Sequence, residues 1–505
     1  MGTGINLYLA SEFEYRRGLA HKLLDENVID FCLADHLPWT EKPEEDERIV
    51  TVDHRPSGND EYDIVCDLNE LPMVSKELME AMLPYESMAI HIGMRRFNYP
   101  TTEYDEEKRK YLQHLRYWNY MLDKYRINLI VTHCIPHSQG KFVVYGLAKV
   151  RKIPMLIWHQ EGFFSERCIW GNSLENLGRN IGKRYVELSS KGVNNFSFDE
   201  DIERAYHACL AKPIKQDKKK YDSLIRKSNS ANYDNGYKYK KKEYARQYFK
   251  SIAKSIIKTG GLSQHYSKGT WFRLYRRHLK AVKYFKRHLC CSIEQYDKIA
   301  KNADYSSRYI LFLPQVYPEA SVIPAAGVFG EQYNSIQLLA RAAEKNGVLV
   351  YVKEHPHLPY RTKDFYDEIK NIKNVRLIKT SEFTYDLIQH SIAVSTQTGT
   401  CIIEAMGIGK PVLVFGQGYL WKDAPGLFEI SDENQGSEII KSIMNGITIN
   451  PDDVKRYFYA IQLETLKEVD VEKNRERVKN DAYVIETFPL DDRVALIKRF
   501  ISEEM

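Results

Sequence analysis

Short apolar runs recur along the first 160 residues, separated by longer segments with helical periodicity. Such runs are typical of strands, and their alternation with helices predicts a doubly wound α/β domain. The expected strands lie at 6–10, 29–33, 48–52, 63–66, 128–132 and 155–158.

A second series of strands begins near residue 309. Its runs are almost wholly apolar, as expected for parallel strands that are buried on both faces. They lie at 309–313, 348–352, 375–378, 392–395 and 411–415. Because 505 residues are too many for a single core, the two series predict two large α/β domains.

The segment between the two series is strongly basic. Residues 211–290 carry 23 Lys and Arg residues against four acidic ones, although the net charge of the chain is only +5. Basic residues recur every fourth position from Lys242 to Lys258, which predicts an amphipathic helix. The segment is interpreted as a solvated helical insertion, as an attachment to an anionic membrane surface, or as a nucleic-acid binder. No RNA- or DNA-binding motif supports the last, so we expect no nucleic-acid partner.

Composition favours an ordinary globular protein, with 43% apolar and 28% charged residues. No apolar run reaches the roughly 18–20 residues of a membrane-spanning helix, and residues 1–17 lack the features of a secretory signal. The eight cysteines show no CxxC pair and no zinc-like spacing. We therefore expect a cytoplasmic protein, peripheral on the inner face of the membrane where the basic segment binds lipid.

The first candidate site, residues 158–167, directly follows an expected strand. Loops after the carboxyl ends of parallel strands hold the ligands of open α/β sheets, so Glu161, followed by Gly162, is expected to face a cleft. A carboxylate there can take the proton of a sugar hydroxyl as a new bond forms. The alternative is a structural Glu161 that caps a helix or pairs with Arg167. The candidates for the acceptor side are His133, His137, His159 and Arg167.

The second candidate site follows the strand at 348–352. His355 can donate a hydrogen bond to a phosphate, and Lys353 and Arg361 can neutralise its charge. Pro356 ends the strand, so that the loop is presented. A lone His-Pro pair is weak evidence, but two cations at the same strand end favour an anion site.

The third candidate site, residues 395–400, joins a strand to a helix. Its hydroxyls, with the backbone N–H groups at the helix start, form a natural cradle for phosphate oxygens. The hydroxyl-bearing residues are Ser395, Thr396, Thr398 and Thr400. The alternative is ordinary helix capping, for which one hydroxyl would suffice.

Together these sites resemble those of the capsular polysaccharide biosynthesis proteins that include bacterial β-Kdo transferases, and more distantly the bacterial GT-B sialyltransferases. Those families share an acidic-acidic-Gly motif, a His-Pro motif and a Ser/Thr-rich motif in this order. The matching residues are Gln160-Glu161-Gly162, His355-Pro356 and Ser395-Thr396. Residues 313–321 also resemble the opening of the donor domain in capsule proteins. The chain departs from the pattern at Gln160, which leaves one carboxylate in the first motif.

The resemblance implies the GT-B architecture, in which two Rossmann-like domains face a central cleft, here with a basic helical insertion. The expected parts are an acceptor domain at 1–200, the insertion at 201–304, a nucleotide-donor domain at 305–465, and helices crossing back at 466–505.

The resemblance also implies an inverting glycosyltransferase that moves a sugar, Kdo or a related acidic sugar from a CMP donor, to a surface polysaccharide or glycolipid. Glu161 is then the general base, and His355 is a donor-phosphate ligand that assists departure. The implied donor-nucleotide ligands are Lys353, Pro356, Arg361, Glu382, Ser395, Thr396, Thr398, Gly399, Thr400 and Glu404. No DxD-type motif is present, so we expect no metal and no cofactor apart from the nucleotide-sugar substrate, with charge met by His355, Lys353 and helix dipoles.

Two alternatives stay open. A transferase of the same fold can use UDP-, GDP- or CDP-linked donors, and a non-catalytic GT-B scaffold can serve a polysaccharide assembly complex. The presence of Glu161, His355 and the four hydroxyls together argues against the scaffold.

Overall fold

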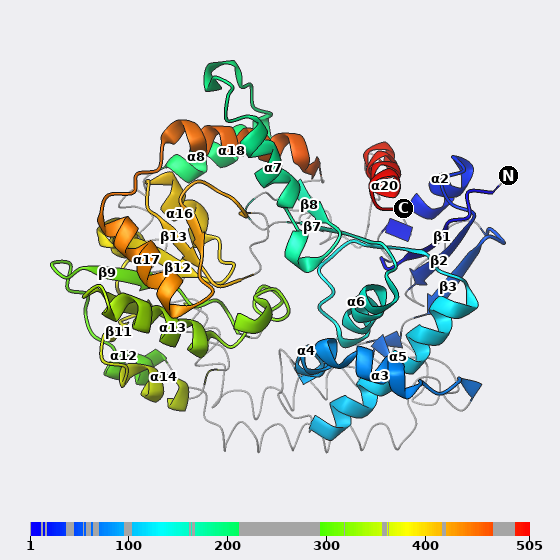
Figure 1. The fold of residues 1–505 in the computed structure, drawn as a ribbon, viewed down its shortest axis with the longest axis horizontal. Coiled ribbons are helices and arrows are strands. Elements are labelled where there is room, and N and C mark those ends of the chain that lie inside the picture. Colours follow the sequence, from blue (N-terminus) through cyan, green and yellow to red (C-terminus); the bar gives the residue numbers. More distant parts are fainter. Residues whose placement is uncertain are drawn as a thin grey trace, which may run out of the picture.

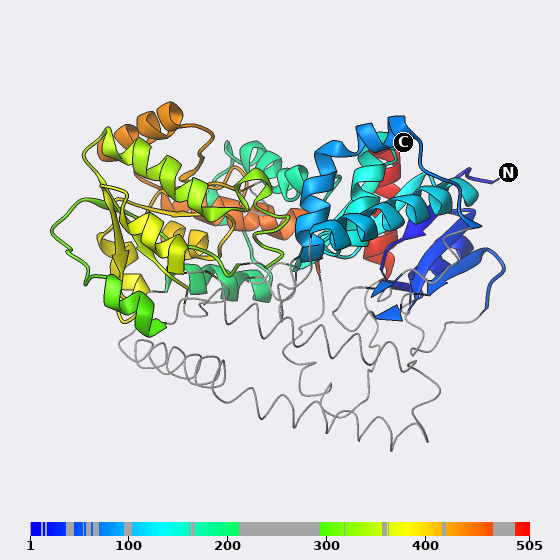
Figure 2. The same cartoon turned by 90° about the horizontal axis from the view of Figure 1, so that it is seen from below.

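Two α/β domains lie side by side in the computed structural model, and both ends of the chain belong to the first (Figures 1 and 2). The structure describes residues 2–11, 14–15, 18–36, 45–53, 55–56, 62–63, 70–94, 104–160, 163, 167–211, 293–317, 319–355, 361, 363–416, 421–467 and 490–505. The predicted fold class, α/β with two Rossmann-like domains, is confirmed.

The first domain is built on a seven-stranded sheet with the order β15-β8-β7-β6-β1-β2-β3. The strands are β1 (Asn6–Leu9), β2 (Phe31–His36), β3 (Ile49–Asp53), β6 (Leu129–Thr132), β7 (Met155–Gln160), β8 (Arg167–Gly171) and β15 (Leu466–Lys467). The sheet is parallel from β7 to β3, and β8 and β15 add an antiparallel edge. Asp63, expected in a strand of this sheet, lies instead in a separate ribbon of β4 (Arg55–Pro56) and β5 (Tyr62–Asp63).

Helices cover both faces of this sheet. Leu7 and Leu9 of β1 belong to a core shared with α2 and α20, whereas Tyr8 between them packs in the core on the other face, against Trp118 of α5. The helices are α2 (Leu19–Asp25), α3 (Lys76–Ala81), α4 (Leu83–Met94), α5 (Tyr104–Lys124), α6 (Gln139–Arg151), α7 (Arg179–Glu187), α8 (Glu200–Leu210) and α20 (Leu490–Glu504), with short 3₁₀ turns at Leu174–Asn176 and Val193–Asn195.

The second domain has a six-stranded, all-parallel sheet with the order β11-β10-β9-β12-β13-β14. The strands are β9 (Tyr309–Phe312), β10 (Leu349–Lys353), β11 (Val375–Ile378), β12 (Ala393–Thr396), β13 (Val412–Val414) and β14 (Leu427–Glu429). The helices are α12 (Ile293–Ile299), α13 (Gln332–Glu344), α14 (Lys363–Lys370), α15 (Thr384–His390), α16 (Cys401–Gly407), α17 (Glu433–Met444) and α18 (Pro451–Glu464), with a 3₁₀ turn at Gly327–Phe329.

Local sequence signals account for several helix starts. Ser138 accepts a hydrogen bond from the backbone N–H of Lys141 and begins α6, and Asp432 accepts two such bonds and begins α17. Asn450 caps α18, where Pro451 occupies the first position, at which the missing N–H is not needed.

After α18 the chain returns to the first domain. β15 pairs with β8, and α20 packs against α2. Arg493 of α20 and Glu14 are both fully buried, and the Nε of the arginine donates to a carboxylate oxygen at 3.1 Å. Because either charge alone in the interior is costly, this pair fixes α20 against the first domain.

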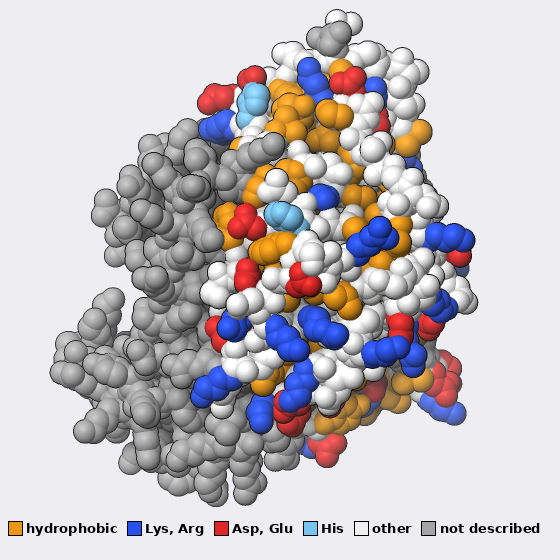
Figure 3. Space-filling view, turned by 90° about the vertical axis from the view of Figure 1, so that its left-hand side faces the viewer, with side chains coloured by type: hydrophobic (Ala, Val, Ile, Leu, Met, Phe, Trp, Pro, Cys, Tyr) orange, Lys and Arg blue, Asp and Glu red, His pale blue; other side chains and the backbone are white. Residues whose placement is uncertain are grey.

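Residues 212–292, which include nearly all of the basic segment, lie outside the described residues. On the face of the second domain shown in Figure 3, Lys and Arg side chains are interspersed with Asp and Glu, so no single sign of charge dominates there. Within the described ranges, no helix combines the length and the apolar character needed to cross a membrane.

Helix α8 lies beside α18 over the second domain and packs closely against α16 (Figure 1). Gly407 lies at the end of α16, and a Cβ atom built on it would overlap the backbone carbonyl of Cys209 in α8. The Cys209 thiol in turn donates to the carbonyl oxygen of Ile403 at 3.4 Å. The absence of a side chain at Gly407 therefore allows the two helix backbones to touch.

We expect Gly407→Ala to separate these helices and to destabilise the protein by about 1–3 kcal/mol, the usual cost of overpacking. Differential scanning fluorimetry would show a lower melting temperature. Gly192→Ala is the matched control, because its φ of −66° suits alanine and its Cβ would meet nothing within 4 Å. Equal melting temperatures for the two variants would contradict the close approach.

Candidate functional site

The strand order of the second domain identifies one edge of its sheet as the ligand edge. The chain runs outward from β9 through β10 to β11, then returns to the other side of β9 and continues through β12, β13 and β14. Open α/β sheets bind ligands where the order reverses, outside the carboxyl ends of the strands. Here that point lies between β9 and β12, so the loops after β9, β10 and β12 form the candidate site.

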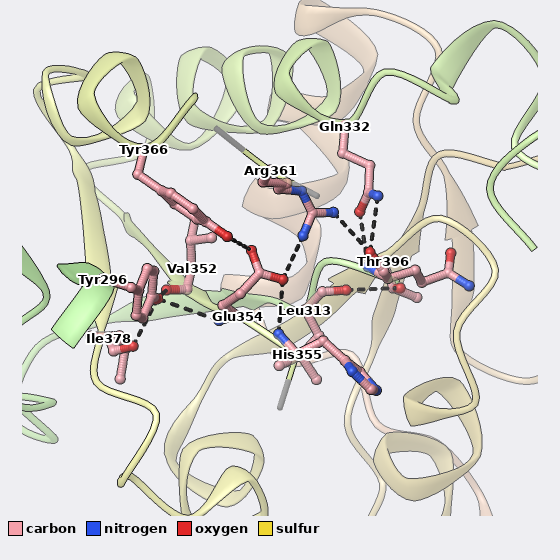
Figure 4. A network of polar contacts seen from close by, with 11 residues as sticks. Tyr296, Leu313, Gln332, Val352, Glu354, His355, Arg361, Tyr366, Ile378 and Thr396 are labelled. Carbon is pink, nitrogen blue, oxygen red and sulfur yellow. Dashed lines mark hydrogen bonds and ion pairs between the residues drawn. The ribbon is translucent and has the colours of Figure 1, made fainter. Parts of the chain in front are cut away.

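A buried carboxylate organises the loop after β10. Glu354 is 1% exposed, pairs with the guanidinium of Arg361, and accepts a hydrogen bond from the hydroxyl of Tyr366 at 2.7 Å (Figure 4). Burial, and then the Glu354 charge, raise the pKa of Tyr366 well above its usual value, so the hydroxyl stays a donor. Tyr296 donates to the strand carbonyls of Val352 and Ile378. The Glu354 carboxylate and the hydroxyls of Tyr296 and Tyr366 therefore have their partners within the fold.

The same carboxylate orients His355. The backbone N–H of His355 donates to Glu354 Oε1 at 2.9 Å, and the imidazole points away from that carboxylate (Figure 4). The side chain of His355 is half-buried. The backbone of His355 is thus held by the buried Glu354–Arg361 pair.

Arg361 and Lys353, the two cations predicted to neutralise a donor phosphate, are both buried in the fold. Arg361 is 6% exposed, donates to the backbone oxygen of Gln315 at 2.8 Å, and lies over the Phe365 ring. Burial alone would lower the pKa of Arg361, but the charges and hydrogen bonds of Glu354 and Tyr366 together outweigh it, and the pKa is raised. Lys353 is also buried. Arg361 therefore joins the loops after β9 and β10 instead of reaching a ligand.

The loops after β9 and β12 are joined by one carboxamide. The side chain of Gln315 accepts from the backbone N–H of Thr398 at 2.8 Å and donates to its hydroxyl at 2.9 Å. The backbone N–H of Gln315 donates to the Gln332 side chain at 2.8 Å, and Gln332 donates back to the Gln315 carbonyl at 3.1 Å. Gln315 thus fixes Thr398 relative to β9.

The structure divides the predicted hydroxyl cradle in two. Ser395 and Thr396 lie on β12 and are fully buried, and the Thr396 hydroxyl donates to the Leu313 carbonyl at 3.1 Å. The Thr396 hydroxyl thus ties β12 to the end of β9, whereas the buried Ser395 hydroxyl has no hydrogen-bond partner among the described residues. Neither hydroxyl is exposed to solvent in this structure. Thr398 is half-buried and Thr400 is exposed.

The turn beyond β12 carries the accessible donors. No acceptor is present, among the described residues, for the backbone N–H groups of Gly399 and Thr400. A Cβ atom on Gly399 would lie 2.8 Å from the Thr396 hydroxyl, so only glycine fits there. Thr400 makes no side-chain capping bond to α16, which removes the capping interpretation for its hydroxyl.

The two predicted glutamates lie further out. The carboxylate of Glu382 accepts from the Tyr305 hydroxyl at 3.0 Å and from the backbone N–H of Ala303 at 3.3 Å, so both of its oxygens have partners in the fold. Glu404 is exposed on α16. Pro356 lies outside the described residues.

In the first domain, three predicted histidines gather at the carboxyl ends of β6 and β7. His133 and His137 follow β6, and His159 is near the end of β7. Burial, and then the proximity of His133 and His137, lower the pKa of His159 to about 4, so its imidazole is neutral near pH 7. Glu161 and Gly162 lie outside the described residues. Within the described part of the chain, no cluster of His, Cys, Asp and Glu could hold a metal ion.

Arg167 is not available to an acceptor. It is 2% exposed and binds the carboxylates of Asp201 at 2.6 Å and Asp199 at 2.7 Å. These contacts fasten the start of α8 to β8. The interpretation that pairs Arg167 with Glu161 concerns a residue outside the described ones.

Sequence reasoning did not single out Glu354, Gln315 or Tyr366. Glu354 stands between Lys353 and His355, and Gln315 lies within the 313–321 segment noted for its resemblance. The signal for Glu354 and Gln315 was their position just beyond a strand, where polar residues need partners, whereas Tyr366 lies on α14 and had no such signal.

Comparison with known families agrees with the motifs. Residues 184–433 match the model of the capsule polysaccharide biosynthesis protein family, which confirms the resemblance over that range. The range contains the loops with His355 and Thr398 but not Glu161. A search of curated proteins gave no match.

Solved structures with similar folds include transferases and an epimerase. A β-Kdo 2,7 transferase KpsC of Thermosulfurimonas dismutans is 12% identical, with 72% of this chain and 89% of that chain covered and a TM-score of 0.28. A UDP-GlcNAc 2-epimerase of Methanocaldococcus jannaschii is 11% identical, with 91% and 98% covered and a TM-score of 0.25. The calicheamicin glycosyltransferase CalG4 is 12% identical, with 96% and 100% covered and a TM-score of 0.23. These scores are too low to carry an argument, so the fold class rests on the sheet topology.

We expect Glu354→Gln to destabilise the second domain by about 3–5 kcal/mol, because it leaves the buried Arg361 without its counter-charge. Chemical denaturation followed by tryptophan fluorescence measures the loss. Glu382→Gln is the control, since its carboxylate is partly exposed and accepts only hydrogen bonds in the contacts above, and it should cost less than about 1.5 kcal/mol. A Glu354→Gln protein as stable as the control would show that the ion pair does not hold the loop.

Proposed function

We propose that this chain, whose residues 184–433 match the model of the capsule polysaccharide biosynthesis protein family, is a glycosyltransferase that uses a nucleotide-sugar donor. The observation that carries the proposal is the edge between β9 and β12. There the buried Glu354 and Arg361 orient His355, and the turn at Gly399 and Thr400 presents open backbone N–H groups.

The donor phosphate would sit at this edge. His355 can donate a hydrogen bond to a phosphate oxygen, and the backbone N–H groups of Gly399 and Thr400 can donate hydrogen bonds to the other charged oxygens. These groups are held before the substrate arrives, so they stabilise the charge on the leaving phosphate without reorganisation. His355 is the group that we assign to assist departure.

The acceptor would bind the first domain at the carboxyl ends of β6 and β7. We assign Glu161, two residues beyond His159, as the general base that removes the proton of the acceptor hydroxyl during an inverting single displacement. The neutral His159 can share hydrogen bonds with sugar hydroxyls there without adding charge.

Donor class, acceptor and location complete the proposal. We favour a CMP-linked acidic sugar such as Kdo as the donor and a surface polysaccharide or glycolipid as the acceptor, in the cytoplasm. UDP-, GDP- and CDP-linked donors are the alternative, and a thermal-shift comparison of CMP, CDP, UDP and GDP distinguishes them. The basic segment 211–290 would hold the enzyme against an anionic membrane.

We predict a division of labour between the domains. His355→Ala should weaken nucleotide binding measured by calorimetry, whereas Glu161→Gln should bind nucleotide like the parent protein. Transfer by Glu161→Gln to a synthetic acceptor should fall by about 10²–10⁴-fold, the usual effect of losing a general base. Equal loss of nucleotide affinity in both variants, or near-normal transfer by Glu161→Gln, would contradict these roles.

A charge test addresses the phosphate site itself. In Gln315→Glu the carboxylate can still accept from Thr398, but it adds a negative charge at the proposed phosphate site. Nucleotide affinity should fall by about 10- to 100-fold, and less at high salt, as expected for a partly solvated charge pair. Gln337→Glu on the exposed side of α13 is the control and should bind normally. Unchanged affinity in Gln315→Glu would argue against an anion at this edge.

A further inference from the structure

A hydrogen bond joins the first domain directly to the loop after β9. The ring nitrogen Nε2 of His91, in the last turn of α4, lies 2.9 Å from the hydroxyl of Tyr317. The two rings also contact, with centroids 6.2 Å apart. His91 belongs to the acceptor side of the molecule, and Tyr317 follows the last strand residue of β9 by five positions.

The loop that carries Tyr317 is attached to Thr398 on both sides of the tyrosine. Before it, the Gln315 carboxamide binds the backbone N–H and the hydroxyl of Thr398. After it, the backbone oxygen of Ser321 accepts from the Thr398 hydroxyl at 2.7 Å. A displacement of Tyr317 therefore acts on Thr398 from two directions.

Thr398 leads directly into the turn with the open N–H groups of Gly399 and Thr400. Two hydrogen-bonded steps and a short stretch of chain connect the first domain to this turn. His91 binds Tyr317, and the residues two positions before and four positions after Tyr317, Gln315 and Ser321, both bind Thr398. Hydrogen bonds require a narrow range of distances and angles, so these contacts fix the orientation of Tyr317 and Thr398 as well as their separation.

We propose that His91 and Tyr317 are positioning residues for the donor-phosphate turn, through which the first domain sets the nucleotide affinity of the second. This inference rests on the proposed function. Neither residue needs to touch the nucleotide, because each acts through Gln315, Ser321 and Thr398. The pair makes donor binding dependent on the placement of the acceptor domain, which is a coupling between two sites.

Calorimetric titration with CMP, run beside CDP, UDP and GDP, tests the proposal on the full-length protein. Tyr317→Phe removes one hydroxyl, and His91→Ala removes its partner. Each should weaken the affinity for the preferred nucleotide by the same factor, about 2- to 10-fold for one net hydrogen bond. The double variant should be no weaker than either single variant, because the two residues act as one unit.

Tyr85→Phe is the matched control. Tyr85 lies on α4 with His91, its ring packs against Tyr145, and no hydrogen bond of its hydroxyl is present among the described residues. This variant should bind nucleotide like the parent protein. Melting curves of all four variants confirm that the folded protein is being titrated.

The possible outcomes separate the inference from the function beneath it. A purely structural pair would lower the melting temperature and leave the nucleotide affinity of the folded protein unchanged, which would overturn the inference alone. Losses that add in the double variant would also overturn it. If the parent protein binds none of the four nucleotides, the proposed function fails and the inference with it.

Discussion

The Glu354–Arg361 ion pair is the constraint on which the second domain's ligand edge depends. Both side chains are buried, so each charge requires the other. The carboxylate also receives the backbone N–H of His355, and the guanidinium holds the carbonyl of Gln315. A single buried ion pair therefore holds the backbone of His355 and the backbone of Gln315, whose carboxamide binds Thr398.

From this pair outward, the site is built in layers of increasing exposure. The side chains of the ion pair are buried, those of Gln315 and Thr398 are half-buried, and that of Thr400 is exposed to solvent. The turn that we assign to a charged ligand is thus hydrogen-bonded to Gln315, which the buried ion pair holds in turn. Rigid support of this kind keeps hydrogen-bond donors aimed before a ligand arrives, which is the arrangement that electrostatic stabilisation requires.

Hydrophobic pattern was sufficient to predict both parallel sheets, because a strand buried on both faces leaves an uninterrupted apolar run. The antiparallel edge was not predictable in the same way, since β15 has only two residues and acquires its partner β8 from a distant part of the chain. The position of a strand end also determines which hydroxyls of the predicted phosphate cradle are exposed. The expected strand ended at residue 395, whereas β12 continues to Thr396, and strand residues in this sheet face the interior. Only the residues beyond the true strand end, Thr398 to Thr400, remain near the surface.

A sequence displays charges but not their partners, and this explains the different surroundings of Arg361 and Arg167, which pair with Glu354 and with Asp199 and Asp201. The neutralisation of Arg361 has a consequence for the site. Because its charge is offset by Glu354 inside the fold, Arg361 holds the loops after β9 and β10 together. The described groups that we assign to a ligand are His355 and the backbone N–H groups of Gly399 and Thr400, which lie nearer the surface. A sequence cannot separate a supporting charge from a ligand-facing donor when both stand just beyond strand ends, because the difference lies in the partners that the fold brings to them.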